Sequence, residues 1–274
     1  MVPRQTFTER LEMTTNAEYH SDPAISASHL SAVTASPYHY WKRYLDPQRP
    51  PSTPTAAMRL GSLVHCAVLE PYELGARYST CASRTTKAGK EQAAELAAAG
   101  IEAVTNDDME LALAMSDAVR NHPMAGILLS AGEAEQSFWW DDAATGLRCK
   151  CRPDWYDGTT IVDLKTTIDA SPTGFAKSVI NFKYHQQACH YMAGLNAERF
   201  IFIAVEKSYP YGVGVYQLDA AAMAAGEALR RQNLQTIADC RAINEWPGYS
   251  TGLQPLSLPG WALSTTQTIT SDDF

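Results

Sequence analysis

The sequence lacks the apolar segments that mark a membrane or secreted protein. None of its apolar runs approaches the roughly 20 residues that a bilayer-spanning helix needs. The opening stretch, MVPRQTFTERLEMTTNAEYH, is polar and contains no apolar signal-peptide centre. We therefore expect a cytoplasmic protein.

Paired cysteines are also missing. The six cysteines, at positions 66, 81, 149, 151, 189 and 240, are scattered and include no CxxC pair. This spacing argues against a secreted disulfide framework, because such frameworks concentrate their cysteines in small domains. We expect free, buried thiols.

An excess of positive charge is absent as well. Lysine and arginine together number 22 against 30 acids, which gives a net charge of −8. Phosphate binding requires cations, so this balance argues against a nucleic-acid partner. It does not exclude one, because a local basic patch can coexist with an acidic exterior, and a cluster of metal-binding carboxylates itself adds negative charge.

What is present is enough apolar sequence for a large core, since 45% of the 274 residues are hydrophobic. Apolar periodicity and capping residues predict helices in seven segments: 25–45 (two short helices), 56–71, 91–100, 105–123, 171–182, 184–197 and 220–246. Alternation predicts strands over 133–140, 146–157, 159–167, 199–207 and 212–219, the first three as an antiparallel meander. This order predicts one α/β domain with a mixed central β-sheet flanked by helices, over residues 25–246. Residues 1–24 are expected to be poorly ordered, and 247–274 to form a polar tail.

Two charges interrupt the strand predicted for TTIVDLKTT, residues 159–167. Because side chains alternate along a strand, Asp163 and Lys165 share one face, and Val162 and Leu164 share the other. Unpaired charge inside a sheet is costly. The pair is therefore either a structural ion pair on an edge strand or part of a functional site.

Asp154 favours the functional interpretation. It lies nine residues before Asp163, across the turn WYDGTT, so two adjacent strands can bring both carboxylates to one end of the sheet. Carboxylate and carbonyl oxygens are the ligands that Mg²⁺ prefers. Lys165 would then lie beside a metal-bound water and a phosphate.

Further candidates surround these three residues. In LRCKCRPD, residues 147–154, alternation places Arg148, Lys150 and Arg152 on the face of Asp154, either as a track for a phosphate backbone or as a solvated strand face. Gln187 and Tyr191 are neighbours at i,i+4 and either hold a phosphate or the lysine, or form an amphipathic edge. His65, in the middle of a predicted helix, is either a partly buried structural group or a metal ligand.

The order of these motifs resembles the PD-(D/E)XK nuclease superfamily. The matching elements are Pro153-Asp154, Asp163-Leu164-Lys165 and Gln187-x-x-x-Tyr191. The sequence is most similar to the exonuclease VIII (RecE-like) branch, through VHCAVLEP at 64–71, RTTKAGK at 84–90 and YHQQACHY at 184–191. The resemblance covers roughly residues 25–245 and implies a restriction-endonuclease-like fold.

The resemblance also implies an activity and a set of roles. It implies a Mg²⁺-dependent exonuclease that digests duplex DNA from 5′ ends and leaves 3′ single strands for recombination, with Mn²⁺ able to replace Mg²⁺. His65, Asp154, Asp163 and the Leu164 carbonyl would hold the metal. Lys165 would activate the water, and Gln187 and Tyr191 would support the lysine and the phosphate.

The remaining expectations concern partners and DNA contacts. Relatives of this branch form rings, trimers or tetramers, around DNA and act with a RecT-type single-strand annealing protein, in bacterial hosts of a phage or prophage. We expect no iron–sulfur cluster, because only Cys240 lies near the C-terminus. Arg84, Lys87 and Lys90 are DNA-contact candidates by charge and position. An endonuclease, a single-strand-specific nuclease and a non-catalytic DNA-end-binding protein remain as alternatives.

Overall fold

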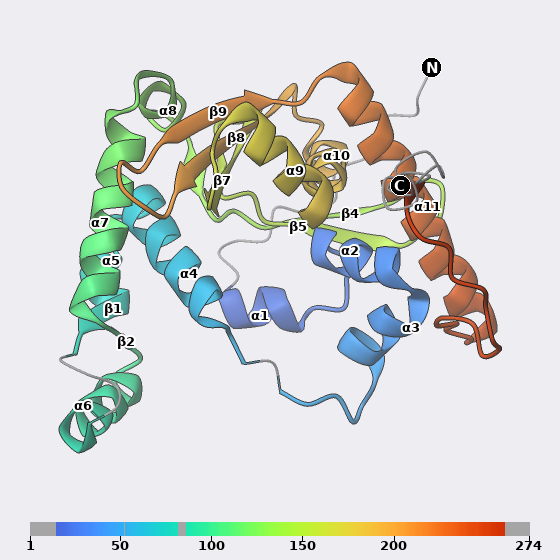
Figure 1. Ribbon diagram of the computed structural model, residues 1–274, viewed down its shortest axis with the longest axis horizontal. Helices are drawn as coiled ribbons and strands as arrows, with labels where there is room; N and C mark the ends of the chain where they lie inside the picture. Colours follow the sequence, from blue (N-terminus) through green and yellow to red (C-terminus); the bar gives the residue numbers. More distant parts are fainter. Residues whose placement is uncertain (1–14, 52, 82–85, 261–274) are drawn as a thin grey trace, which may run out of the picture.

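The computed structural model describes residues 15–51, 53–81 and 86–260 and has the expected mixed α/β architecture. A five-stranded sheet forms its centre, with helices on both faces (Figure 1). The strands are β3 (Glu133–Ala134), β6 (Trp155–Tyr156), β7 (Thr160–Thr167), β8 (Arg199–Glu206) and β9 (Val213–Gln217), in the order β3-β6-β7-β8-β9. Within this sheet only β7 and β8 run parallel, and both are buried on their two faces, which explains the nearly unbroken apolar run of β8.

The predicted three-stranded meander is divided between two sheets. β4 (Phe138–Asp141) and β5 (Arg148–Cys151) form a separate antiparallel pair, while β6 joins β7 in the central sheet. The strand predicted over 146–157 is interrupted between β5 and β6 at Pro153, because proline has no backbone N–H to donate to a neighbouring strand. A further short parallel pair, β1 (Tyr78–Thr80) and β2 (Glu102–Val104), was not predicted.

The helices largely follow the predicted segments. They are α1 (Asn16–Ser21), α2 (Ala27–Ala35), α3 (Pro37–Tyr40), α4 (Ala56–Leu69), α5 (Leu74–Arg77), α6 (Lys87–Ala98), α7 (Asn106–Asn121), α8 (Pro123–Leu128), α9 (Pro172–Phe182), α10 (Tyr184–Leu195) and α11 (Ala220–Ile243). A π-helical turn, Trp41–Leu45, continues α3. Helix α1 lies in the segment expected to be poorly ordered, and Pro123 begins α8 as its first residue instead of only ending α7.

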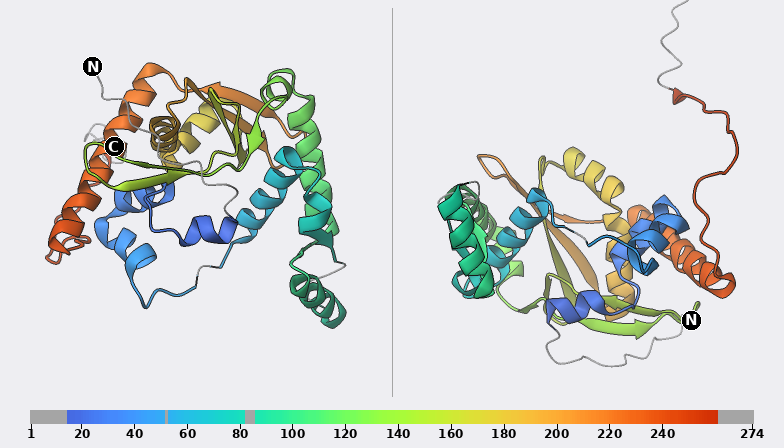
Figure 2. Two further views of the ribbon diagram at one scale, coloured as in Figure 1. Left: turned by 180° about the vertical axis from the view of Figure 1, so that it is seen from behind. Right: turned by 90° about the horizontal axis from the view of Figure 1, so that it is seen from below.

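Two apolar clusters lie on opposite sides of the sheet, and the alternation of β7 divides its side chains between them. Ile161 packs with residues of α2, α10 and α11, whereas Val162 and Leu164 pack with α4 and α7. Figure 2 shows these two helical layers with the strands between them. The predicted core face of β7 is thus confirmed. The predicted free thiols are confirmed too, since all six cysteines are buried and unpaired.

Candidate active site

Asp163 is the most buried charged residue of β7, with an exposed fraction of 0%. Its Oδ2 lies 2.5 Å from Nζ of Lys165, and its Oδ1 accepts a hydrogen bond of 2.7 Å from Nε2 of Gln187 on α10. The two charged residues within the apolar run of β7 are therefore in direct contact. The side-chain amide of Gln187, on α10, holds the carboxylate of Asp163.

Burial sets the electrostatics of this pair. It raises the pKa of Asp163 to about 6, although Lys165 acts in the opposite direction, and the neighbouring Asp154 raises that pKa further. Burial lowers the pKa of Lys165, but the two carboxylates outweigh it and hold that pKa above its ordinary value. The lysine is therefore an ammonium at neutral pH.

Asp154 approaches β7 from the side at which the central sheet is incomplete. Strand β6 pairs with Ile161 and Val162 only, so it leaves the β7 edge beyond Val162 uncovered. There, Oδ2 of Asp154 accepts a hydrogen bond of 2.7 Å from the backbone N–H of Leu164. Asp154 thus reaches β7 at the residue next to Asp163, and the joint role of the two carboxylates as metal ligands stays a prediction. The Leu164 carbonyl as a metal ligand stays a prediction.

His65 and Glu135 complete a group that can hold a cation. Nδ1 of His65, on α4, lies 3.6 Å from Oδ2 of Asp154. One ligand atom from each of His65, Glu135 and Asp154 lies within 4.8 Å of the others, and all three residues are half-buried. One imidazole nitrogen and two carboxylate oxygens are a donor set that suits a divalent metal.

Glu135 was not identified from the sequence. Its backbone N–H donates to the Asp154 carbonyl at 3.3 Å, and its φ of +55° turns the chain between β3 and β4. Burial first, and Asp154 second, raise the pKa of Glu135 to about 8. The strand pairing explains its place: Ala134 pairs with Trp155, and that antiparallel register sets Glu135 opposite Asp154.

Helix α10 contacts the Asp163–Lys165 pair through Tyr184 and Gln187. The lysine is covered by Tyr184, whose ring centroid lies 4.6 Å from Nζ of Lys165, whereas Gln187 contacts Asp163. Tyr191 is half-buried against Phe200, with ring centroids 6.1 Å apart, and burial raises the pKa of Tyr191. Its predicted role at the phosphate stays a prediction.

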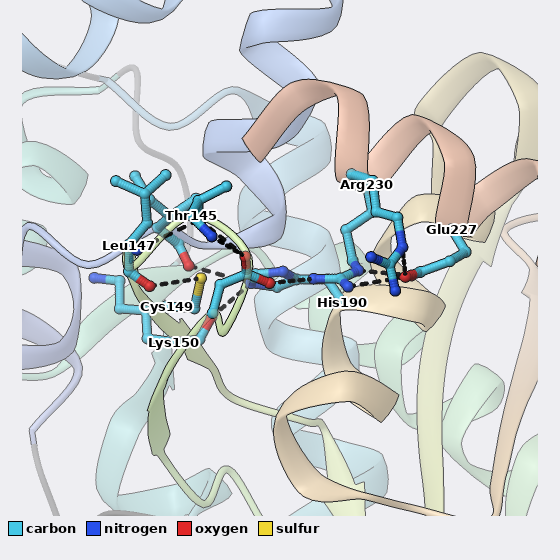
Figure 3. Close-up of polar contacts among 10 residues, drawn as sticks. Thr145, Leu147, Cys149, Lys150, His190, Glu227 and Arg230 are labelled. Carbon is cyan, nitrogen blue, oxygen red and sulfur yellow. Dashed lines mark hydrogen bonds and ion pairs between the residues drawn. The ribbon is translucent and has the colours of Figure 1, made fainter. Parts of the chain in front are cut away.

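The predicted basic stripe on β5 is interrupted in its middle. Lys150 is buried, and its ammonium donates to the carbonyls of Tyr19 and, at 2.8 Å, Asp22. Its own carbonyl lies 3.2 Å from Nε2 of His190 (Figure 3). The N-terminal segment folds over this strand face, so Lys150 does not present its charge to DNA as predicted.

The other basic candidates are differently placed. Arg148 lies 3.6 Å from Asp141, and Arg152 donates to the Ser137 hydroxyl at 2.7 Å and packs over the Tyr19 ring. Lys87 and Lys90 are exposed in the first turns of α6, which projects away from the sheet (Figure 1). Arg84 lies outside the described residues. DNA contact by these residues stays a prediction.

With this geometry in hand, the chain can be compared with known proteins. The model of the PDDEXK-like domain of unknown function (DUF3799) matches residues 26–257, and the chain belongs to this family. The resemblance to PD-(D/E)XK proteins is therefore confirmed. No curated protein matches the sequence.

One solved structure has a similar fold over nearly the whole chain. The crystal structure of a "Putative exonuclease" from Eubacterium rectale superposes with a TM-score of 0.64 at 13% identity, covering 94% of this chain and 100% of that one. An alkaline exonuclease from Laribacter hongkongensis shares 16% identity over 64% of this chain and 96% of its own, but its TM-score of 0.29 is too low to support an argument. At 13% identity the comparison with the first structure shows a shared fold and nothing more. In the part of the chain that the structure describes, no helix is both long and apolar enough to cross a membrane.

Proposed function

We propose that the protein is a Mg²⁺-dependent exonuclease that digests double-stranded DNA from 5′ ends and leaves 3′ single strands. The observation that carries this proposal is the contact between Lys165 and Asp163 at the uncovered edge of β7, where Asp154 also binds. Two acids and a lysine in this arrangement suit phosphodiester hydrolysis, because the reaction needs a bound cation and a group that stabilises new negative charge.

Asp154 and Asp163 are the residues that would hold the metal, with His65 and Glu135 as further ligands. The raised pKa of Glu135 and Asp163 fits this role, since buried neighbouring carboxyls are relieved by a cation. A divalent cation bound there supplies an activated water and offsets charge on the phosphate.

The chain's own groups then have separate tasks. The Lys165 ammonium donates hydrogen bonds toward the attacking water or the phosphate, and Asp163 fixes its position. Gln187 orients Asp163 by holding the oxygen that does not face the lysine. Tyr184 shields the ammonium from water on one side, so the ammonium interacts more strongly with a phosphate.

The direction of digestion and the biological setting rest on the resemblance to RecE-like exonucleases. We propose that the product is a substrate for a RecT-type annealing protein, and that copies of the chain assemble into a ring on DNA. A ring suits the net charge of −8, because cations can face an internal channel while the exterior stays acidic. Cytoplasmic location and phage origin belong to the same proposal.

One digestion experiment tests these points together. Linear duplex labelled at its 5′ or its 3′ end is incubated with Mg²⁺ or with chelator, beside a closed circular duplex. The proposal expects early release of 5′ label, retention of 3′ label, no cleavage of the circle and no reaction in chelator. Cleavage of the circle would identify an endonuclease, and binding without any cleavage would identify a DNA-end-binding protein.

A further inference from the structure

A cavity of about 290 Å³ opens beside Lys165, and the hydrolysis described above does not use it. Its walls are the end of β7, the turn that follows, one side of α9, and Tyr184. It therefore lies at the carboxyl end of the parallel strands β7 and β8, where open α/β sheets bind ligands. Lys165 belongs to both sites, so the cavity adjoins the reacting centre.

The walls of this cavity carry a net positive charge. Lys177 on α9 and Lys207 after β8 line it together with Lys165. Among the described residues, neither Lys177 nor Lys207 has an acid within the 4.0 Å of an ion pair. Asp169 also lines the cavity: hydrogen bonds from Ser171, the backbone one at 2.8 Å, lower the pKa of its carboxylate, and the charge of Lys177 lowers it further. With three lysines against one aspartate, the walls favour an anionic ligand such as phosphate.

Two stacked aromatic rings extend from Lys165 toward solvent. The ring of Tyr184, beside the Lys165 ammonium, stacks on that of Phe182 with centroids 5.5 Å apart and an interplanar angle of 26°. Phe182 is nonetheless 62% exposed, so much of its ring surface remains free. Ile168, which also lines the cavity, is 85% exposed. A phenylalanine supported from one side and open on the other is typical of platforms on which nucleic-acid bases stack.

We propose that this cavity binds one unpaired nucleotide of the DNA strand, next to the phosphate that Lys165 contacts. The base stacks on Phe182, and the phosphate groups face Lys177 and Lys207. The occupant is single-stranded, because a base inside a duplex is already stacked on both sides and cannot reach the ring. This inference rests on the proposed nuclease function and adds a subsite that separates a frayed end from its complement.

Phe182→Ala tests the stacking, with Ile180→Ala as its matched control. Ile180 lies on the same helix and is 58% exposed, but it does not line the cavity. The probe is a fluorescently labelled single-stranded oligonucleotide, whose Kd is measured by anisotropy in chelator. Stacking of one base predicts a rise in Kd of about fivefold or more for Phe182→Ala. Ile180→Ala keeps the wild-type Kd, and Phe182→Trp restores most of the affinity.

A double variant, Lys177→Gln with Lys207→Gln, tests the phosphate contacts. The slope of log binding constant against log salt concentration becomes shallower by about 0.7 for each lysine replaced. An unchanged slope, or a Phe182→Ala variant that binds like wild type, would overturn the proposal. Thermal melting of each variant confirms that it is folded.

Turnover separates this proposal from the nuclease function. On linear duplex with Mg²⁺, Phe182→Ala raises KM while kcat stays within about twofold of wild type, because the ring does not touch the reacting atoms. If oligonucleotide binding depends on Phe182 but the protein never cleaves DNA, the nuclease function is contradicted and the nucleotide subsite is supported. If the protein cleaves DNA with a KM that Phe182→Ala does not change, the nuclease function is supported and the subsite is contradicted.

Discussion

Gln187 donates a hydrogen bond of 2.7 Å to Asp163, from a helix on one face of the sheet to a strand at its centre. The contact holds the carboxylate oxygen that Lys165 does not occupy. In metal sites, partners of this kind fix the direction in which a ligand points. Gln187 is therefore a positioning residue.

We expect replacement of the Gln187 amide to weaken the response to Mg²⁺ without removing a metal ligand. We expect Gln187→Ala to lower the apparent Mg²⁺ affinity or the activity by about 10- to 100-fold, the usual effect of losing such a partner. The measurement is initial digestion rate across a Mg²⁺ titration. Gln232→Ala, an exposed glutamine on α11, is the control. A wild-type titration curve for Gln187→Ala would show that Asp163 needs no such support.

Glu135 should make cation binding at this site sensitive to protons. Because its pKa is about 8, Glu135 is mostly protonated at pH 7 without metal, and cation binding must displace that proton. Calorimetry in two buffers of different ionisation enthalpy should therefore detect proton release when Mg²⁺ or Mn²⁺ binds at pH 7. Glu135→Gln should abolish most of that release and weaken binding. Equal release from the variant would place the proton elsewhere.

We expect Lys165 to contribute to turnover and not to metal binding. Its ammonium is paired with Asp163 and donates no lone pair to a cation, so Lys165→Ala should bind Mn²⁺ near the wild-type affinity while digestion falls by at least about 100-fold. Equilibrium binding and digestion rate are measured on the same preparation. Unchanged turnover would remove the lysine from the mechanism.

A buried ion network around Arg230 should make the stability of the fold depend on pH. Arg230 on α11 lies 3.3 Å from Asp142 and 2.7 Å from Glu227 (Figure 3). Burial raises the pKa of Asp142, but hydrogen bonds from Thr145 and the charge of Arg230 outweigh it, so that pKa lies below its ordinary value. An acid with a depressed pKa stabilises the fold above its unfolded pKa and loses this effect as pH falls.

Asp142→Asn should consequently cost up to about 3 kcal/mol of unfolding free energy at pH 7, because it leaves a buried guanidinium with one partner. The difference from wild type should shrink below about pH 4, where the unfolded carboxyl is itself protonated. Urea denaturation at pH 7 and at pH 3.5 measures both. A difference independent of pH would mean that packing, not charge, sets the cost. Asp117→Asn, on the exposed side of α7, is the control.

Local sequence patterns predict much of this molecule because they depend on neighbouring residues. The alternation of β7 correctly divides Val162 and Leu164 from Asp163 and Lys165. The nine-residue spacing correctly brings Asp154 to the same strand, where it binds the Leu164 N–H. Both inferences need only strand geometry and a short turn.

The rest depends on contacts between distant segments. Lys150 has the strand phase of a solvent-facing cation, yet carbonyls of the N-terminal segment, more than 120 residues earlier, bind its ammonium. The sequence of β5 alone therefore does not indicate that the N-terminal segment covers Lys150. Glu135 joins the site only through a positive φ and a two-residue strand pairing, which no periodicity reveals. The cavity beside Lys165 likewise needs α9, α10 and the end of β8 to be placed together.

The most direct test is anomalous diffraction from a crystal soaked in Mn²⁺. We expect one strong peak bound by carboxylate oxygens of both Asp154 and Asp163, with the Lys165 ammonium beside it and His65 or Glu135 as a further ligand. A peak held by His65, Glu135 and Asp154 while Asp163 stays locked between Lys165 and Gln187, or no peak at this edge of the sheet, would contradict it.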